Sequence, residues 1–382
     1  MPADAINLGI VGAGGRGGAF AAILHELGLR VRAICELDTA ALEQAREKLG
    51  AERVYTDYEQ MLDDAALDAV LIGTPMPLHA KQAIAALQRD IHVLCEVTAA
   101  VSLEQCREVV HAAVRARAIY MMAENYIYTR PNQFIKGLVE AGLFGDVYYA
   151  EGEYLHELKL RNEQTPWRRH WQTGLRAMTY PTHSLGPILS WMPGDRIARL
   201  CCEDTGSHHR DRDGNLYATD STVMLAKTEQ GRLIKLRLDM ISDRPHAMMN
   251  YQLQGTDGAY ESSREGPGER DKVWLRTLAP EPRWLDLATL AHTPGFRQHL
   301  PAIWRDPSPV MRQAGHGGGD YVMLHDFARA VRGEIACPIN VHRAMDLTLP
   351  ALLSQTATET QRWVDVPDSR DWLASTPRAT SA

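Results

Sequence analysis

The sequence predicts an α/β domain built on a doubly wound parallel sheet, followed by an α+β domain with a large, mostly antiparallel open sheet. In residues 1–123, short apolar runs alternate with segments of helical period, which is typical of βαβ units. In residues 124–367, apolar runs mainly follow one another across turns, as in an antiparallel meander. Residues 368–382 are expected to form a C-terminal tail.

The first strand and helix are joined by a glycine-rich turn. The apolar run 6–11 predicts a strand, and the Ala-rich segment 19–27 predicts a helix. Between them, the first glycine permits a tight turn, the second lets the backbone approach a pyrophosphate, and the third lets the helix pack on the strand. The phosphates are expected at the helix N-terminus. The candidate contacts are Gly12, Gly14, Gly15, Arg16 and Gly17.

A carboxylate completes this dinucleotide-binding pattern. The second apolar run, 31–35, ends at Glu36, nineteen residues after Gly17. A carboxylate at this position accepts hydrogen bonds from both hydroxyls of the adenosine ribose and repels a 2′-phosphate. The sequence therefore predicts NAD rather than NADP as the cofactor.

The rest of the first domain continues the alternation. Further strands are expected at 68–73, 91–96 and 118–123, and helices at 38–49, 79–88 and 103–115. Ligands of such sheets bind at the carboxyl ends of the strands. The residues that follow these strands are therefore candidate cofactor contacts, with a structural role as the alternative for two of them, His79 and Glu96. These candidates are Thr74, Pro75, His79, Glu96 and Asn125.

The second domain is predicted as a helix near 131–141 followed by a series of strands. The strands are expected at 146–154, 196–203, 221–226, 232–240, 248–253 and 258–261, and Gly255–Gly258 is the clearest turn. Two helices, about 321–332 and 341–363, end the domain.

Composition excludes several classes of partner. The net charge of −7 without a basic block argues against nucleic acid, and no apolar run approaches the roughly 20 residues that span a membrane. Six cysteines without a CxxC pair favour reduced thiols and a cytoplasmic protein. Residues 207–214 resemble a calcium loop but lack its terminal Glu, so no metal site is expected.

Several motifs in order resemble the Gfo/Idh/MocA oxidoreductases. They are GIVGAGGRG, CELD, DAVLIGTPMPLHA and VLCEVTAA, and the resemblance extends to about Pro367. It implies a Rossmann domain, a sheet domain, tightly held NAD(H), and a sugar or cyclitol substrate. It also implies a homodimer or homotetramer, since members often pair through the open sheet.

Two departures point to one branch of that family. Its dehydrogenases carry Glu-Lys-Pro after the fifth strand, whereas this chain has Glu96-Val97-Thr98, and Val97 transfers no proton. Its dehydrogenases also place Asp four residues before the catalytic His, where this chain has Thr179. Both changes resemble the NAD-dependent glycoside hydrolases of family 109. The shared segments are Met-Met-Ala-Glu-Asn at 121–125, Tyr-Leu-His at 154–156, Tyr-Pro-Thr-His at 180–183 and the His-Gly-Gly segment at 316–321.

This branch resemblance implies hydrolysis without net redox change. The sugar is oxidised at C3, the aglycone leaves C1 by elimination, water adds, and the ketone is reduced again. His183, with Tyr180 one helical turn earlier, is expected to serve the 3-hydroxyl. The C2 proton or the orientation of the sugar is assigned to Tyr154, His156 and Glu124, and Tyr321 is a further catalytic candidate. For Tyr154 the alternative is cross-strand packing.

The segment between Tyr154 and His183 suggests a rim over the substrate. Aromatic rings stack on sugars, and arginines bind anions. An anionic glycoside such as a sulfoquinovoside is therefore a candidate substrate, and an exposed charged loop is the alternative interpretation. The candidate residues are Lys159, Arg161, Trp167 and Arg168. An NAD-dependent sugar or cyclitol dehydrogenase and a non-enzymatic sugar or dinucleotide sensor are the competing functions.

Overall fold

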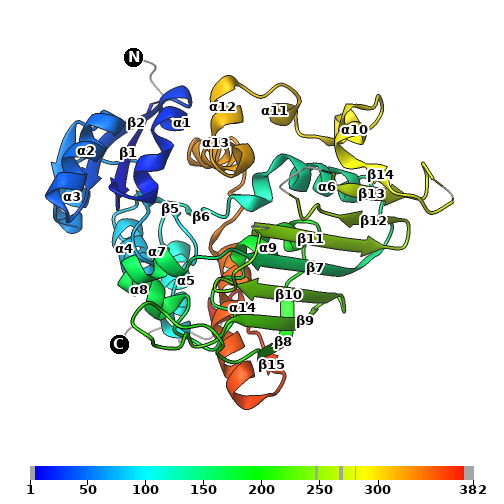
Figure 1. The fold of residues 1–382 in the computed structure, drawn as a ribbon. Coiled ribbons are helices and arrows are strands. Elements are labelled where there is room, and N and C mark those ends of the chain that lie inside the picture. Colours follow the sequence, from blue (N-terminus) through cyan, green and yellow to red (C-terminus); the bar gives the residue numbers. More distant parts are fainter. Residues whose placement is uncertain (1–4, 246–247, 266–269, 280, 374–382) are drawn as a thin grey trace, which may run out of the picture. The chain divides into compact units, whose positions relative to one another are not determined.

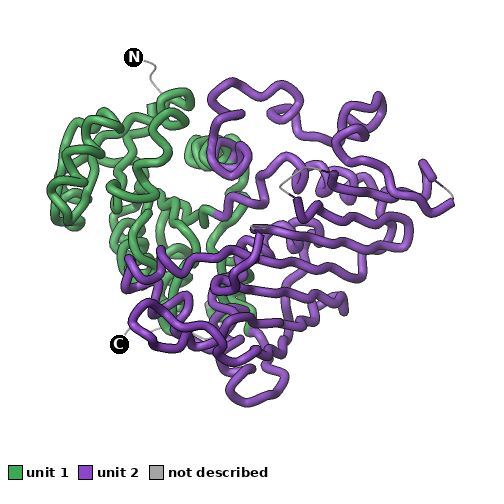
Figure 2. Tube along the Cα trace, in the orientation of Figure 1, with its two compact units in different colours: residues 1–123, 323–349, 367–382 green, residues 124–322, 350–366 purple. Residues whose placement is uncertain are grey.

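The computed structural model describes residues 5–245, 248–265, 270–279 and 281–373. Its contacts divide the chain into two compact units (Figure 2). The first unit contains residues 1–123, 323–349 and 367–382, and the second contains residues 124–322 and 350–366. Of the tail expected at 368–382, residues 374–382 lie outside the described part.

The first unit contains six parallel strands in the order β3-β2-β1-β4-β5-β6 (Figure 1). The order reverses beside β1, which is the switch point where doubly wound sheets bind ligands. The predicted fold class is thereby confirmed for this unit. The strands are β1 (Ile6–Val11), β2 (Leu29–Cys35), β3 (Arg53–Tyr55), β4 (Ala69–Ile72), β5 (His92–Cys95) and β6 (Tyr120–Met122).

Helices of the first unit begin at side-chain caps in three cases. Asp38, Asp57 and Ser102 each accept a backbone N–H of the following helix. The glycine-rich turn leads instead into a short 3₁₀ helix, η1 (Arg16–Phe20), before α1 (Ala21–Glu26). The other helices of residues 1–123 are α2 (Thr39–Leu49), α3 (Tyr58–Asp64), α4 (Met76–Leu87) and α5 (Leu103–Arg115).

The second unit is organised around a nine-stranded sheet in the order β14-β13-β12-β11-β7-β10-β9-β8-β15 (Figure 1). Its neighbouring strands are antiparallel except for β7 and β10, so the expected mostly antiparallel sheet is confirmed. The strands are β7 (Val147–Leu155), β8 (Ile197–Asp204), β9 (Ser221–Thr228), β10 (Leu233–Asp239), β11 (Met248–Gly255), β12 (Gly258–Glu261), β13 (Lys272–Leu275), β14 (Leu285–Asp286) and β15 (Val364–Asp365).

One face of this sheet is covered by α9 (Thr182–Ser190). The helix packs at Gly152 of β7, where an added Cβ would lie 3.0 Å from Ile188 and 3.1 Å from Ser184. The remaining helices of the described residues are η2 (Tyr126–Tyr128), α6 (Arg130–Glu140), α7 (Lys159–Gln164), α8 (Pro166–Trp171), α10 (Leu287–His292), η3 (Arg297–His299), α11 (Ala302–Arg305), α12 (Pro309–Gln313), η4 (His316–Gly318), α13 (Gly319–Val331), α14 (Val341–Thr360) and η5 (Asp371–Leu373).

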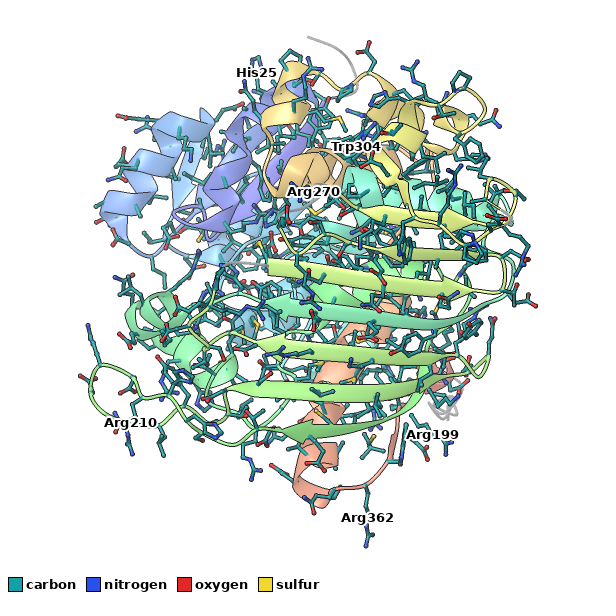
Figure 3. The ribbon with its side chains drawn as sticks, turned by 45° about the vertical axis from the view of Figure 1, so that its right-hand side comes forward. His25, Arg199, Arg210, Arg270, Trp304 and Arg362 are labelled. Carbon is teal, nitrogen blue, oxygen red and sulfur yellow. The ribbon has the colours of Figure 1, made fainter. Side chains whose placement is uncertain are left out.

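The opposite face of the sheet carries cross-strand ion pairs. Lys235 of β10 pairs with Glu151 of β7 at 2.7 Å, and Lys272 of β13 pairs with Glu261 of β12 at 3.5 Å. Figure 3 shows this sheet with side chains, with labels on Arg199 of β8 and on Arg270, which precedes β13. Among the described residues, no helix has both the length and the apolar character needed to cross a bilayer.

Candidate functional site

A buried histidine–carboxylate pair lies on the covered side of the second unit's sheet. His183 Nδ1 lies 2.8 Å and 3.0 Å from the two carboxylate oxygens of Glu124, whose side chain is fully buried. The backbone N–H of Tyr126 donates to Glu124 Oε1 at 3.0 Å. Because a carboxylate oxygen accepts hydrogen bonds, we assign the ring proton of His183 to Nδ1, which leaves the lone pair of Nε2 available as a base.

The local sequence places both members of the pair. Glu124 follows β6 by two residues, and His183 is the second residue of α9. An added Cβ on Gly186 would lie 2.8 Å from Glu124 Cγ, so glycine is required for the carboxylate to reach the helix. The hydroxyl of Tyr251 donates to the backbone oxygen of His183 at 2.7 Å and fixes the start of the helix.

A tyrosine–histidine pair lies next to His183. The Tyr154 hydroxyl is 2.8 Å from His156 Nδ1, and the ring centroids of Tyr154 and His183 are 5.8 Å apart. Tyr180 contacts both Tyr154 and His183, with centroid separations of 5.7 Å and 5.0 Å. Burial raises the pKa of Tyr154 well above its ordinary value, while the charges of Arg168 and Arg161 act in the opposite direction.

The predicted rim residues fall into two groups. Arg161 and Arg168 lie close enough to Tyr154 to favour its phenolate. The guanidinium of Arg168 also stacks on the Trp167 ring at 4.4 Å. Lys159, in contrast, forms an ion pair with Asp243, so its charge is already engaged by the protein.

A third group of side chains adjoins the same site. His316 Nδ1 lies 3.1 Å from Asp320 Oδ1, and Asn125 Nδ2 donates to the same oxygen at 2.9 Å. The Tyr126 ring contacts both His183 and His316, at 4.8 Å and 5.3 Å between centroids. Asn125 therefore joins the histidine cluster of the second unit, and its predicted contact with the cofactor stays a prediction.

The glycine-rich turn of the first unit fits a dinucleotide. Gly12 has a φ of +78°, and an added Cβ would lie 2.7 Å from the Gly73 backbone. A Cβ on Gly17 would lie 2.6 Å from Ile10 Cγ2, so this glycine permits close packing of helix on strand. Gly15 faces open space, and no side chain caps the helix that follows it. These features leave room for a pyrophosphate at the glycine-rich turn.

Glu36 is held in an orientation suited to a ribose. Its Oε2 accepts the N–H of Gly14 at 3.1 Å and its Oε1 accepts the N–H of Leu37 at 2.8 Å. The carboxylate thereby lies at the glycine-rich turn, and its remaining lone pairs are available to hydroxyl donors. The residues present fit NAD at this position.

The other predicted cofactor residues form a supporting network in the first unit. Arg16 pairs with Glu96 at 2.9 Å and lies over the Phe20 ring at 4.4 Å. His79 is buried, and its two ring nitrogens lie 2.7 Å and 2.8 Å from the backbone oxygens of Thr98 and Thr74. We interpret His79 as a link between the segments that follow β4 and β5. Pro75 is the N-cap residue of α4, which also fixes the course of this segment.

Sequence reasoning identified most of the cluster but not its pairing. No role was predicted for Tyr126, His316 or Asp320, although the segment 316–321 was noted as a shared motif. The contact between His316 and Asp320 depends on a non-helical backbone at His316, Gly317 and Gly318. Tyr321 follows Asp320 directly and is buried. Its catalytic role stays a prediction. Among the described residues, no group of three His, Cys, Asp or Glu side chains could hold a metal ion.

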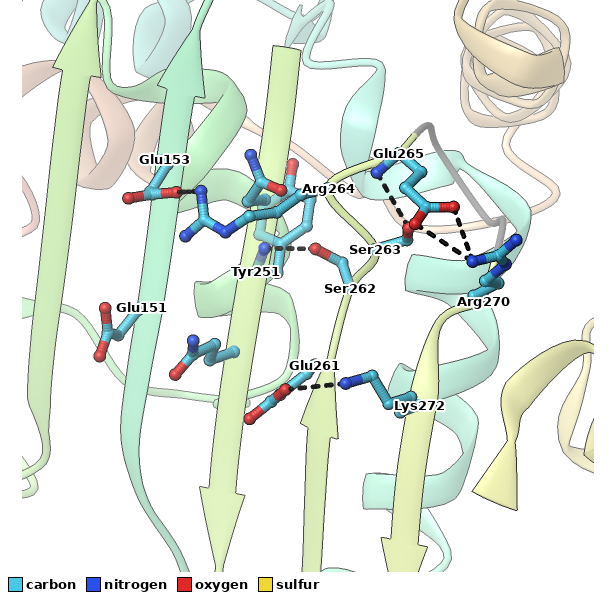
Figure 4. A pocket seen from close by; sticks show the side chains of 12 residues that line it. Glu151, Glu153, Tyr251, Glu261, Ser262, Ser263, Arg264, Glu265, Arg270 and Lys272 are labelled. Carbon is cyan, nitrogen blue, oxygen red and sulfur yellow. Dashed lines mark hydrogen bonds and ion pairs between the residues drawn. The ribbon is translucent and has the colours of Figure 1, made fainter. Parts of the chain in front are cut away.

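A separate cavity lies on the charged face of the sheet (Figure 4). It has a volume of about 420 Å³ and is lined from β7, β11, β12 and β13. Glu153 pairs there with Arg264 at 2.6 Å. Asn250 also lines it and is buried, and neither of its amide atoms has a hydrogen-bond partner among the described residues.

Comparison with known families identifies both parts of the chain. The Gfo/Idh/MocA model, described as "Oxidoreductase family, NAD-binding Rossmann fold", matches residues 6–124. The model "Glycosyl hydrolase 109, C-terminal domain" matches residues 128–372, which is more than half of the chain. The chain belongs to glycosyl hydrolase family 109. The resemblance inferred from the motifs is thus confirmed, and this family 109 chain is an NAD-dependent enzyme of the glycosidase class.

Curated relatives and solved structures agree with this assignment. A glycosyl hydrolase family 109 protein of Shewanella woodyi is 30% identical, over 84% of the family 109 chain and 75% of the relative. An alpha-N-acetylgalactosaminidase of Shewanella oneidensis is 27% identical, over 96% and 85% of the two chains. A levoglucosan dehydrogenase solved with NADH and L-sorbose shares the fold, with a TM-score of 0.80, 21% identity, and coverage of 96% of this chain and 100% of that one.

Proposed function

We propose that the enzyme hydrolyses a glycoside by oxidation at C3, elimination of the aglycone, addition of water and reduction of the ketone. The observation that carries this proposal is the Glu124–His183 pair with the Tyr154–His156 pair beside it. Two neighbouring proton-transfer pairs suit a reaction in which two different protons of one sugar are removed. Val97, where related dehydrogenases carry a lysine, supports the assignment of the first proton to His183.

His183 acts on the 3-hydroxyl. Glu124 accepts a hydrogen bond from Nδ1–H of His183, so the Nε2 lone pair is available to take the proton of the hydroxyl group. The buried carboxylate also stabilises the imidazolium that this transfer creates. We therefore assign Glu124 as a positioning residue for His183, in place of a direct role at C2.

Tyr154 acts at C2, where a ketone at C3 makes the proton acidic. Since burial raises its pKa, the hydroxyl is protonated at neutral pH and needs an acceptor before it can serve as a base. His156 Nδ1, 2.8 Å away, is that acceptor. Arg161 and Arg168 favour the negative charge that develops on the phenolate oxygen.

The glycine-rich turn and Glu36 hold the cofactor, with the turn at the pyrophosphate and the carboxylate at the adenosine ribose. When bound, NAD supplies the acceptor for the hydride from C3 and later the donor that returns it. Arg16, paired with Glu96, orders the turn beside this site.

The substrate class follows from the charges near Tyr154. Arg161 and Arg168 together with the Trp167 ring favour a sugar that carries an anionic group, such as a sulfoquinovoside. The relative named as an alpha-N-acetylgalactosaminidase makes an N-acetylated sugar the neutral alternative. Both sugars belong in the first experiment.

The test follows two signals in heavy water. The enzyme and NAD+ are incubated with 4-nitrophenyl α-glycosides of sulfoquinovose and of N-acetylgalactosamine, and nitrophenol release and NADH absorbance are recorded together. Release without net NADH, with deuterium at C2 of the product, supports the proposal. Stoichiometric NADH with the glycosidic bond intact contradicts it and indicates a sugar dehydrogenase.

We further propose that copies of the chain associate through the charged sheet face, as a homodimer or homotetramer. This face presents carboxylates and cations side by side, so a second copy related by two-fold symmetry can match opposite charges. Light scattering after size-exclusion chromatography tests the proposal, and a monomer at micromolar concentration contradicts it.

A further inference from the structure

The two helices that carry the predicted rim residues bury almost nothing of their own. α7 and α8 are each six residues long, and no side chain caps the N-terminus of either helix. Among their residues, all of which the structure describes, Asn162 alone is buried. Helices this short are not stable by themselves in water, so contacts with other segments must hold α7 and α8 in place.

The loop of residues 207–217, labelled at Arg210 in Figure 3, makes such contacts with α8. Nη2 of Arg169 donates to the backbone oxygen of Leu216 at 3.1 Å and pairs with Asp211 at 3.3 Å. The same guanidinium lies 4.5 Å from the ring centroid of Tyr217, a residue that is 1% exposed. One side chain of α8 is therefore tied to the loop at three points.

The same loop also holds α7. Oε1 of Glu163 accepts the backbone N–H of Arg212 at 3.1 Å and the hydroxyl of Tyr217 at 3.3 Å. The two helices thus share one contact, since Glu163 binds the hydroxyl of Tyr217 and Arg169 lies over its ring. We call Glu163 and Arg169 the tether residues.

The loop has a defined shape because its polar groups bond to one another. Oδ1 of Asp211 accepts the N–H groups of Asp213 and Asn215 at 3.1 Å and 2.8 Å. The N–H of Asp211 donates to the backbone oxygen of Asn215 at 2.8 Å, and Gly214 has a φ of 85°, which suits glycine. The segment that resembles a calcium loop in the sequence is thus a self-bonded turn, able to support the two helices.

The rim residues lie next to the tether residues in the chain. Arg168 precedes Arg169, and Arg161 lies two residues before Glu163. Adjacent side chains of a helix differ in direction by about 100°, and those two apart by about 200°. Each helix therefore has one side on the loop and another side toward Tyr154, whose charge the two rim arginines affect. A helix released from the loop would also release its rim arginine.

We infer that Arg169 and Glu163 are positioning residues for substrate specificity, which act by fixing Arg168 and Arg161 in place for the anionic group of the sugar. The inference rests on the proposed function and assigns part of its charge preference to residues outside the site. Side chains that are ordered before the sugar arrives lose less conformational entropy when it binds. The tether residues therefore act on KM more than on kcat.

The experiment removes one tether and separates substrate binding from catalysis. Hydrogen–deuterium exchange measures the order of residues 159–171, and kcat and KM are measured with the 4-nitrophenyl α-glycosides of sulfoquinovose and of N-acetylgalactosamine. In Arg169→Ala we expect exchange of this segment to rise about tenfold or more. KM for the sulfoquinovoside should rise about three- to tenfold, with kcat and the affinity for NADH within about twofold of the wild type.

Two comparisons show whether the tethers act through the rim. In a background of Arg161→Ala and Arg168→Ala, Arg169→Ala should change KM for the sulfoquinovoside less than about twofold, because the residues it positions are gone. Glu163→Ala should raise KM as Arg169→Ala does, whereas Glu163→Gln keeps an oxygen acceptor for both donors and should match the wild type. The control, Arg212→Ala, removes an exposed arginine of the same loop and keeps the backbone N–H that Glu163 accepts.

Unchanged exchange of residues 159–171 in Arg169→Ala overturns the inference. An equal rise of KM on both glycosides, or the same rise in the background without Arg161 and Arg168, also overturns it, while cleavage by the wild type still supports the proposed function. A wild type that cleaves only the N-acetylgalactosaminide overturns it as well, since there is then no charge preference to set. Accumulation of NADH by the wild type without cleavage overturns the proposed function, and the same variants then test the inference through KM for NADH formation.

Discussion

Replacement of Glu124 by Gln tests the pairing on which the proposed chemistry depends. Glu124 Oε1 accepts the backbone N–H of Tyr126 and Oε2 lies 2.8 Å from His183 Nδ1. In Glu124→Gln the one amide oxygen must serve the fixed N–H of Tyr126. The amide nitrogen then faces Nδ1 and donates to it, so the proton of His183 moves to Nε2 and the base is lost.

The expected loss of kcat follows from the free-energy cost of the amide orientation in which the glutamine oxygen faces His183 Nδ1. Turning the amide leaves the buried Tyr126 N–H without an acceptor, which costs about 1–3 kcal/mol and makes the productive orientation about 5- to 150-fold rarer. Loss of the carboxylate's stabilisation of the imidazolium adds to this, so we expect kcat to fall about 10³- to 10⁴-fold. Because Glu124 positions His183 without reaching the sugar, KM should change little.

Two measurements check this prediction. Single-turnover absorbance of NADH gives the rate of C3 oxidation, and ¹⁵N chemical shifts of the imidazole report which nitrogen of His183 carries the proton. Glu151→Gln, which removes an ion pair with Lys235 on the other face of the sheet, is the matched control and should keep wild-type rates. If Glu124→Gln keeps kcat within threefold of the wild type, the pair does not operate as described.

Three further outcomes are expected. Glu36→Ala should weaken NADH binding about 10- to 100-fold, as measured by fluorescence titration, because a charged acceptor of the ribose hydroxyls is lost. Arg168→Ala and Arg161→Ala should each raise KM for a sulfoquinovoside about tenfold or more and change KM for a neutral glycoside little. Burial lowers the pKa of His79, His92 and His342, so below about pH 6.5 the unfolded chain binds protons that the folded chain does not. The free energy of unfolding should therefore fall as the pH drops from 7 to 5, and His79→Gln should reduce this dependence in urea titrations.

Each outcome has a control. Wild-type NADH affinity in Glu36→Ala would refute the assignment of Glu36 to the ribose, and Glu43→Ala on α2 is its comparison. Equal KM changes on charged and neutral glycosides would show that the arginines act on the fold instead of on an anion, with Arg46→Ala as the control. For the pH dependence, exposed His25→Gln should behave as the wild type, and an unfolding free energy that rises on acidification contradicts the explanation.

The fold was predictable because its signals are local. The strands of the first unit are mostly buried apolar runs, and the turn at Gly12 requires glycine for reasons visible in the sequence. The strand β3 was missed because its residues, Arg53–Tyr55, are not buried and lack an apolar run. Residues 323–349 belong to the unit formed by the N-terminal strands, although most strands of the second unit precede them along the chain.

Several candidate site residues could be named from the sequence, but the hydrogen bonds between them could not be predicted. His183, Tyr154 and Glu124 lie in motifs that can be recognised one by one. That Glu124 binds His183, 59 residues away, depends on how α9 packs on the sheet and on the absence of a side chain at Gly186. The segment 316–321 was recognised as a motif, but the position of His316 depends on three consecutive residues of positive φ, a conformation that the sequence alone does not specify.

The two outer strands of the nine-stranded sheet, β14 and β15, have consequences for how the protein can assemble. Each is only two residues long, Leu285–Asp286 and Val364–Asp365, and each ends in an aspartate. Strand addition at a sheet edge needs a longer row of free backbone N–H and C=O groups, and charged side chains oppose it. The sheet therefore offers little template for end-to-end fibre growth through its edges. The charged face of the sheet remains the surface through which we propose that copies of the chain form a closed homo-oligomer.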